Sequence, residues 1–316
     1  MSAAPASGRT VVPLIMGPTG AGKTDLALRL AERLPIEIVS VDSAMVYRGM
    51  NIGTGKPPPE ALRRHPHHLV DILDPSESYS AGQFVRDACQ AIDEIRGRGN
   101  LPLLVGGTML YFRALRRGLA ELPQADPQVR GEIDAEAARR GWSALHADLA
   151  AIDPAAAARI QPRDAQRIQR ALEVYRLTGA TLTQLHASAA GPRPDLSFLA
   201  YAWAPADRTR LYAGIERRLR EMLRAGFLDE VRALYARGDL HARLPAIRSV
   251  GYRQLWEHLT GEAPLEVAVE RAVFATRQLA RRQLVWLRSD SEVRWVDALE
   301  AEAYAHMERS LTTLVC

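Results

Sequence analysis

The sequence predicts an α/β fold, a parallel β-sheet flanked by helices with an inserted all-helical domain. Two observations support this prediction. A short buried strand over 9–16 runs into a glycine loop and a helix over 24–34, and a second strand follows at 36–41, which is the order of a βαβ unit. Between residues 126 and 185 the strand signal disappears, and helices punctuated by proline and glycine replace it.

The remaining elements complete this pattern. A helix around 81–96 precedes a third strand at 101–105, which ends in Gly106-Gly107-Thr108. After the helical insertion, we expect a strand at 198–203, long helices at 207–237 and 265–288, a strand at 293–296 and a terminal helix. The chain should therefore comprise a first part of the core at 1–120, a helical insertion at 121–195 and a second part of the core at 196–316.

Composition restricts the class of protein. The 316 residues are 47% hydrophobic and 25% charged, as in an ordinary globular protein. The apolar stretch at 11–16 is far shorter than the roughly 20 residues of a membrane span and runs into a glycine loop, not a cleavage site. Cys89 and Cys316 are too few for a disulfide framework. We expect a cytoplasmic protein with no membrane association, and nothing implies a protein partner.

Basic residues are concentrated in the C-terminal half. Residues 207–288 hold 16 Arg against 10 Asp and Glu, although the net charge of the chain is only +4. This imbalance suits a phosphate-rich partner such as nucleic acid, and it equally suits a solvated arginine-rich helix surface. Of the 41 basic residues, only Lys23 and Lys56 are lysines, and both lie in glycine-rich loops.

The most specific motif is G-x-x-x-x-G-K-[ST], which follows the first strand and opens a helix. It predicts a P-loop NTPase-like core in which backbone N–H groups and a helix N-terminus hold a diphosphate or triphosphate. Lys23 would contact the outer phosphate oxygens, and the Thr24 hydroxyl can ligate Mg²⁺. The motif does not say which bond breaks. Its residues are Gly17, Pro18, Thr19, Gly20, Ala21, Gly22, Lys23 and Thr24.

The loops after the second and third strands provide further candidates. Asp42 follows the second strand, where a carboxylate can accept a proton from a nucleophile aligned on the bound phosphate ester. It could instead cap a helix or lie in the outer shell of Mg²⁺. The third strand ends in Gly106-Gly107 without the acidic residue typical of many P-loop hydrolases, which argues against ATP hydrolysis. For Thr108, capping of the next helix is favoured over phosphate binding.

Three other segments have less specific patterns. The polar segment 47–57 is typical of a surface loop, and the histidines at 65, 67 and 68 lack the partners of a metal cluster, so a structural role is favoured. Arg277, Arg281 and Arg288 share one helix stripe, which could face a polyanion or solvent. Segment 247–254 places two arginines and Tyr252 around a glycine, a pattern suited to phosphate contact and base stacking.

These motifs together resemble one family, the tRNA dimethylallyltransferases, also called tRNA isopentenyltransferases. The resemblance covers nearly the whole chain and rests on the segments 17–24, 41–57, 67–75, 103–111, 164–179, 247–254 and 275–288. It implies transfer of a dimethylallyl group from dimethylallyl diphosphate to N6 of the adenosine on the 3′ side of the tRNA anticodon, with Mg²⁺ and release of pyrophosphate.

The resemblance also implies residue roles. Lys23, Thr24 with its Mg²⁺, and Arg218 would stabilise the departing pyrophosphate, and Asp42 would deprotonate the attacking amine. The adenosine would be extruded from its stack into the protein, and the helical insertion would hold the anticodon stem. The implied tRNA contacts are Asp42, Ser43, Ala44, Met45, Thr108, Arg130, Gln166, Arg167, Ile168, Gln169, Arg170, Ile247, Arg248, Ser249, Val250, Gly251 and Tyr252.

The chain departs from the family pattern at three positions. Met45 stands where many relatives have Gln, Gly55 where Ala is usual and Arg281 where Lys is usual. The chain also lacks the C-terminal zinc-finger cysteines of eukaryotic relatives, so it is more similar to the bacterial form. Two other interpretations of the motifs remain: a small-molecule P-loop kinase in which Asp42 activates a hydroxyl, and an RNA-binding protein that uses a nucleotide as a switch.

Overall fold

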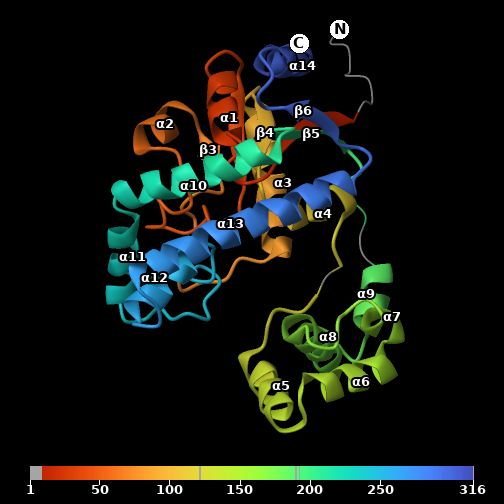
Figure 1. Cartoon of the computed structure of the whole chain (residues 1–316). Helices are drawn as coiled ribbons and strands as arrows, with labels where there is room; N and C mark the ends of the chain where they lie inside the picture. Colours follow the sequence, from red (N-terminus) through yellow and green to blue (C-terminus); the bar gives the residue numbers. More distant parts are fainter. Residues whose placement is uncertain (1–8, 121, 189–190, 192, 316) are drawn as a thin grey trace. The chain divides into compact units, whose positions relative to one another are not determined.

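The computed structural model describes residues 9–120, 122–188, 191 and 193–315. The chain divides into two compact units, one comprising Met1–Ala114 with Pro194–Cys316 and the other Leu115–Arg193. Both units are drawn in Figure 1. Among the described residues, no helix has the length and apolarity needed to cross a membrane.

The first unit is built on a six-stranded sheet in the order β3-β2-β4-β1-β5-β6, and every neighbouring pair is parallel. The predicted α/β class is confirmed. The two-residue strand β3 is an addition, because it is too short to leave a pattern in the sequence. The strands are β1 (Thr10–Met16), β2 (Ile36–Val41), β3 (His67–His68), β4 (Leu101–Gly106), β5 (Leu196–Ala204) and β6 (Arg294–Asp297).

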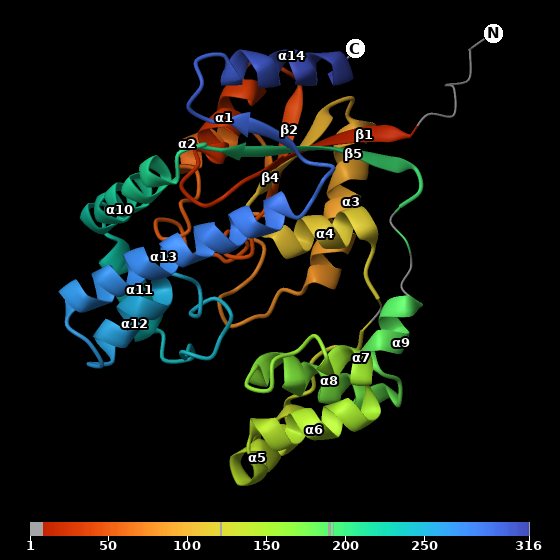
Figure 2. The same cartoon turned by 45° about the vertical axis from the view of Figure 1, so that its right-hand side comes forward.

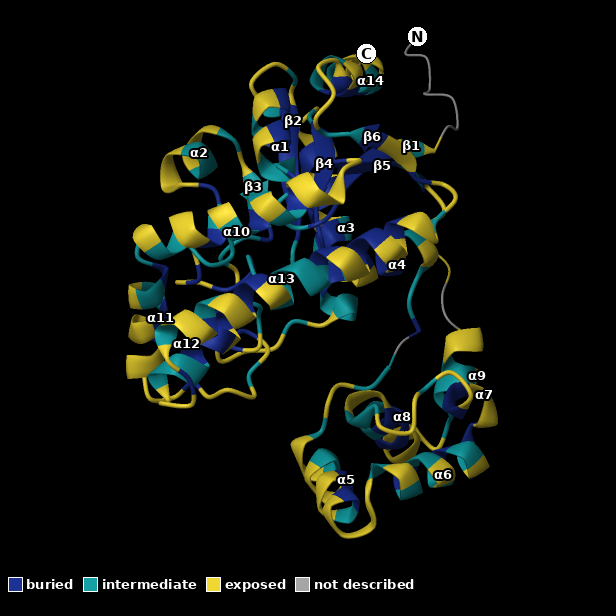
Figure 3. Cartoon of the chain, viewed as in Figure 1, coloured by how far each residue is buried: buried dark blue, intermediate teal, exposed yellow. Residues whose placement is uncertain are grey.

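Helices cover both faces of this sheet. Figure 2 shows α1 and α14 on one side and α3 and α4 on the other. Strands β2 and β4 are buried throughout (Figure 3), as expected for a parallel sheet covered on both faces. The helices of this part are α1 (Lys23–Ala31), α2 (Pro59–Arg64), α3 (Ala81–Gly97), α4 (Met109–Arg117), α10 (Arg208–Arg224), α11 (Phe227–Ala236), α12 (Tyr252–Leu259), α13 (Leu265–Arg288) and α14 (Ala303–Val315).

The prediction of a single helix over 207–237 is wrong. The segment forms two helices, α10 and α11, separated at Gly226, whose φ of 99° lies outside the helical region. Glycine adopts this conformation with little strain. The break redirects the chain so that Phe227 and Val231 of α11 become fully buried, whereas a continuous helix would carry them away from that core.

The histidine run has a structural role in the described part of the chain. His68 Nε2 lies 2.7 Å from Oε2 of Glu37, a buried carboxylate on β2. Arg98 donates two hydrogen bonds to the same carboxylate, and Asn100 donates a third. Chiefly because of the Arg98 hydrogen bonds, the pKa of Glu37 falls to about 2. Glu37 therefore stays ionised in its buried position, where its partners offset the desolvation of the charge.

The second unit consists of helices around their own apolar core. Aspartates cap three of them: the Asp126, Asp153 and Asp164 carboxylates accept hydrogen bonds from backbone N–H groups of the first turns. Fully buried Ile133, Leu145 and Ile168 contribute to the core. The helices are α5 (Pro127–Arg140), α6 (Trp142–Ile152), α7 (Pro154–Ala157), α8 (Ala165–Thr178) and α9 (Leu182–Ala187).

Candidate functional site

The register of the sheet brings three loops together. Met16 of β1 and Val41 of β2 both pair with Gly106 of β4, so the three strands end at the same level. At that level the backbones approach closely, because a Cβ on Gly106 would collide with the Val41 carbonyl. The P-loop, the loop with Asp42 and the loop with Thr108 therefore meet at the carboxyl edge of the sheet, where open α/β sheets bind ligands.

The P-loop is closed around its own lysine. Gly20 and Gly22 adopt φ values of 80° and 78°, which only glycine reaches without strain. Lys23 Nζ donates a hydrogen bond to the Pro18 carbonyl at 2.7 Å. The ammonium is thus held within the loop that the motif assigns to a phosphate chain.

Charged groups of separate elements converge on Lys23. The pKa of Lys23 is lowered from 10.5 to about 8, chiefly by burial; the negative charge of Asp42 opposes this shift, and the positive charge of Arg218 on α10 adds to it. Two cations and one carboxylate thus surround the mouth of the P-loop. Such an excess of positive charge favours an anionic ligand.

A cavity of about 940 Å³ opens at this point, at the upper end of the range for ligand pockets. Lys23, Thr24, Asp42 and Arg218 all line it, and so does Thr108. The structure therefore brings the predicted catalytic residues into one site. Apolar side chains form another part of its wall, namely Val105, Ile215, Leu219 and Met222.

The two carboxylate oxygens of Asp42 have different surroundings. Oδ1 accepts hydrogen bonds from the backbone N–H groups of Ala44 at 2.8 Å and Met45 at 3.3 Å. This oxygen caps the turn that follows β2. Within the described residues, Oδ2 accepts no hydrogen bond, so it is available to a proton in the cavity.

Thr108 stands directly before α4, where its carbonyl accepts hydrogen bonds from the N–H groups of Tyr111 and Phe112, but its hydroxyl is engaged elsewhere. Its Oγ1 accepts a hydrogen bond from the Ser43 backbone N–H at 3.0 Å, and its own N–H donates to the Val41 carbonyl. Thr108 therefore ties the loop after β4 to the loop after β2. This contact sets the position of the Asp42 turn.

Gln283 is a site residue that the sequence analysis missed. It is buried on α13, accepts a hydrogen bond from the Thr19 N–H at 2.9 Å and donates one to the Gly107 carbonyl at 2.8 Å. A Cβ on Gly107 would lie 2.5 Å from its Nε2, so the glycine makes room for the amide. One side chain thus joins the P-loop to the loop after β4.

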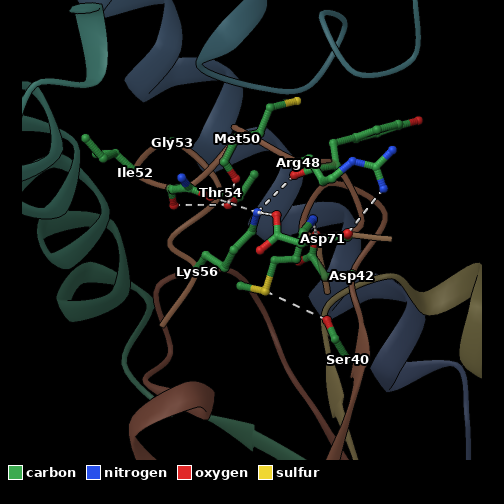
Figure 4. Close-up of polar contacts among 12 residues, drawn as sticks. Ser40, Asp42, Arg48, Met50, Ile52, Gly53, Thr54, Lys56 and Asp71 are labelled. Atoms are coloured by element: carbon green, nitrogen blue, oxygen red, sulfur yellow. Dashed lines mark hydrogen bonds and ion pairs between the residues drawn. The ribbon is translucent and has the colours of Figure 1, made fainter. Parts of the chain in front are cut away.

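The segment 47–57, expected to be an ordinary surface loop, is held by buried charge. Lys56 is 2% exposed; its ammonium donates to Asp71 Oδ1 at 2.6 Å, the Tyr47 carbonyl at 2.9 Å and Asn51 Oδ1 at 3.0 Å. Figure 4 shows Lys56 and Asp71 directed at one another. Asp71 reaches this position in a left-handed conformation, at φ 56°. A compact ammonium with three donors fits these three acceptors.

Glu230 of α11 holds the tip of the same loop. Its carboxylate accepts hydrogen bonds from the N–H groups of Asn51, Ile52 and Gly53 and from the Tyr252 hydroxyl at 2.6 Å. Glu230 was not predicted, because nothing in its sequence neighbourhood identifies a loop more than 170 positions away. It fixes one wall of the cavity, to which Gly53 belongs.

Tyr252, which the sequence predicts to contact RNA, lines the cavity but offers no exposed ring face for stacking on a base. The ring is fully buried, lies 4.9 Å from the Phe227 ring at 76°, and its hydroxyl is committed to Glu230. Ile247 is also fully buried, so an RNA contact there could involve only its backbone. Ser249, Val250 and Gly251 line the cavity, and Arg248 does so from the surface.

Arg218 packs against one of the residues that depart from the family pattern. A Cβ on Gly55 would collide with Nη2 of Arg218. Gly55 also has a φ of 67°. The absence of a side chain at this position therefore allows the guanidinium to lie over the loop.

The second unit carries the other predicted RNA contacts, and several are engaged internally. Arg130 pairs with fully buried Glu173 at 2.9 and 3.1 Å, and Arg170 pairs with the same carboxylate at 3.0 Å. Gln169 donates to Asp134 at 2.6 Å. The Ile168 side chain lies in the helical core, so it is not available to RNA. Gln166 and Arg167 of α8 are the exposed members of this group.

The arginine stripe of α13 is only partly available to an anion. Arg277 is half-buried and pairs with Glu216 of α10 at 2.8 Å, which is a structural ion pair. Arg281 and Arg288 are exposed. Among the arginines of α13, Arg282 lines the cavity, whereas the predicted stripe does not.

The site fits a Mg²⁺ ion that is coordinated mainly by phosphate and water. Thr24 lines the cavity, and its hydroxyl makes no hydrogen bond to any residue in the described ranges. Mg²⁺ in phosphate sites uses one or two protein oxygens together with phosphate and water. Thr24 would hold such an ion beside a bound diphosphate.

The fold and the site define a P-loop α/β protein with a helical insertion. Its phosphate loop faces an acidic residue across a cavity that also has apolar walls. Comparisons with known proteins identify the family. The chain matches the IPP transferase model over residues 45–290 and the isopentenyl transferase model over residues 10–71.

The chain therefore belongs to the IPP transferase family. It is 55% identical, over 93% of its length and 94% of the relative, to the tRNA dimethylallyltransferase of Thioalkalivibrio sulfidiphilus. Among solved structures it is similar to the tRNA isopentenylpyrophosphate transferase of Bacillus halodurans, with 36% identity, a TM-score of 0.69 and 97% of each chain covered. It is also similar to a eukaryotic dimethylallyltransferase acting on tRNA, with 25% identity and a TM-score of 0.79, covering 96% of this chain and 78% of that one.

The lowered pKa of Lys23 predicts a pH limit on anion binding. The ammonium is charged below about pH 8 and loses its proton as the pH rises through that value. Pyrophosphate affinity should therefore weaken by up to about fivefold between pH 8 and 9, unlike that of an ordinary lysine site. Calorimetric titration with pyrophosphate from pH 7 to 9.5 measures the affinity. Dividing the wild-type affinity by that of Lys23→Met at each pH removes the contribution from ionisation of pyrophosphate itself. A wild-type to variant ratio that stays constant with pH would contradict the prediction.

Removal of the Gln283 amide should uncouple the loops. Gln283→Leu keeps a similar volume but leaves the Thr19 N–H and the Gly107 carbonyl without partners. We expect the free energy of unfolding to fall by about 1–3 kcal/mol and pyrophosphate binding to weaken. Denaturant unfolding and calorimetry measure both. Gln278→Leu on the same helix is the matched control, and equal effects of the two substitutions would refute the assignment.

Proposed function

We propose that this protein is a tRNA dimethylallyltransferase, which joins the dimethylallyl group of dimethylallyl diphosphate to N6 of the adenosine on the 3′ side of the anticodon and releases pyrophosphate. One observation supports the proposal above the others. Lys23, Thr24 and Arg218 share a single cavity with Asp42, so an anion-binding centre faces a proton acceptor. The proposed site of action is the cytoplasm, where tRNA is used.

In this reaction the P-loop holds the leaving group. The bond from C1 of the prenyl group to the diphosphate oxygen breaks, and negative charge accumulates on the departing pyrophosphate. Lys23 and Arg218 lie where they can stabilise that charge as it develops. Mg²⁺ bound through Thr24 would supply further positive charge. The apolar wall of Val105, Ile215 and Met222 suits the prenyl chain.

Asp42 takes the proton that the adenosine loses. As N6 forms its bond to C1, it must give up one hydrogen, and the free Oδ2 of Asp42 can accept it. Since Oδ1 is held by two backbone N–H groups, the carboxylate has a fixed orientation.

The RNA must present an adenosine that has left its stack. The amine of a stacked base cannot reach Asp42, so the nucleotide has to enter the cavity, at a cost of a few kcal/mol that contacts to the rest of the loop offset. Lining residues available to such a nucleotide are Ser43, Ala44, Met45 and Thr108. In the proposed complex, the second unit holds the anticodon stem-loop through exposed groups such as Arg167.

A small-molecule kinase is the alternative, and two features make it less suitable. Strand β4 ends in Gly106-Gly107, without the carboxylate that helps many P-loop enzymes hold the metal of ATP. The cavity is also large, with an arginine-bearing rim at Arg217, Arg248 and Arg282. Such a rim suits a polyanion better than a metabolite.

Transfer of label distinguishes the two functions. Incubation with dimethylallyl diphosphate labelled in the prenyl chain, Mg²⁺ and unmodified tRNA should move the label into RNA, on an N6-modified adenosine after digestion. The matched reaction replaces the donor by ATP labelled at the γ-phosphate, with a small hydroxyl compound as acceptor. Label that stays out of RNA while phosphate moves to the metabolite would establish the kinase.

Two substitutions of Asp42 should distinguish the roles of its two carboxylate oxygens. Asp42→Asn retains an oxygen to cap the turn at Ala44 and Met45 but removes the base. We expect kcat to fall by about 10²–10⁴-fold with small changes in the KM of either substrate. Asp42→Ala, which also loses the cap, should in addition lower the melting temperature. Steady-state kinetics and thermal unfolding measure the two effects, and an unchanged kcat in Asp42→Asn would exclude Asp42 as the base.

A further inference from the structure

A second groove adjoins the catalytic cavity. It has a volume of about 750 Å³ and lies on α12 and α13 of the first unit (Figure 1). Arg248, Val250 and Arg282 line both hollows. A ligand that leaves the cavity past these residues would therefore enter the second groove directly.

This groove contains an aromatic ring open to solvent. Phe274 of α13 is 64% exposed, the largest exposed fraction among the large apolar residues in the described part of the chain. A single exposed apolar residue is ordinary on a protein surface. This ring, however, lies in a groove with four arginines, Arg248, Arg253, Arg271 and Arg282.

The charges of the groove favour an anion. Two acidic residues, Glu257 and Glu270, also line it, so the arginines exceed the carboxylates by two. Glu257 lies 3.8 Å from Arg253 and 3.6 Å from Arg271, and both arginine side chains remain about half exposed, at 51% and 54%. At these distances the glutamate orients the guanidinium groups but leaves their N–H donors available to a phosphate.

We propose that the groove binds the nucleotide next to the one in the catalytic cavity, with its base stacked on Phe274 and its phosphate held by the arginines. This inference rests on the proposed function, because it takes RNA as the ligand. An exposed ring beside guanidinium groups is the combination that binds unstacked nucleotides. When one adenosine leaves the stack, its neighbour loses a stacking partner, and Phe274 replaces that partner.

Fluorescence can test the stacking directly. A synthetic anticodon stem-loop carries 2-aminopurine, whose emission is quenched by stacking, at the nucleotide beside the target adenosine. With the wild-type protein the emission should change on binding. Phe274→Ala and Phe274→Leu should lose that change and raise the Kd for the stem-loop by roughly tenfold, whereas Phe274→Tyr should restore both.

Kinetics and a matched control complete the experiment. The variants should raise the KM for RNA far more than the KM for dimethylallyl diphosphate. Val285→Ala is the control, because Val285 is 57% exposed on the same helix and lines neither hollow; it should behave as the wild type.

Three outcomes have distinct meanings. If the wild-type protein does not bind the stem-loop, the proposed function fails. If it binds but Phe274→Ala keeps the same fluorescence change and Kd, the nucleotide groove is refuted while the proposed function stands. If Phe274→Ala alters the sedimentation of the RNA-free protein, a protein surface covers the groove and the inference is overturned.

Discussion

The close, level alignment of β1, β2 and β4 is the constraint on which the site depends. Gly106 pairs with both Met16 and Val41, and only a residue without a side chain permits that approach. Because the three strands end together, the loops that follow them must share one space. The phosphate loop, the Asp42 turn and Thr108 are therefore neighbours, although they are separated by up to 90 residues in the chain.

Side chains that bridge between loops then fix this arrangement. Gln283 joins the P-loop to the loop after β4, Thr108 joins that loop to the Asp42 turn, and Glu230 holds the tip of the segment 47–57. Each is buried or partly buried and pairs with backbone groups that would otherwise lack partners, so each loss has a cost in free energy. These side chains thus hold the P-loop, the Asp42 turn and the segment 47–57 in position around the cavity.

Resemblance to the family led us to expect certain residues at the RNA-binding surface, and the structure shows that several of them are buried or paired within the protein. Tyr252 and Ile168, both expected at the RNA surface, belong to cores. Arg130 and Arg170 pair with a buried glutamate instead of facing solvent freely. The exposed groups beside the cavity are Phe274 and a set of arginines on α12 and α13 and in the segment before α12. The exposed arginines beside the cavity therefore lie on a different part of the C-terminal half from the predicted stripe that includes Arg277.

The sequence alone determined the parallel sheet, the helical insertion and the position of the P-loop, because hydrophobic periodicity and the P-loop spacing are local properties of the chain. It also placed Asp42 correctly, since the residue after a parallel strand must lie at the ligand edge. Only the tertiary structure decided which side chains are buried: the break at Gly226, the burial of Tyr252 and the partners of Lys56, Glu230 and Gln283. These depend on contacts between residues far apart in the chain, and a local pattern carries no signal of a distant partner.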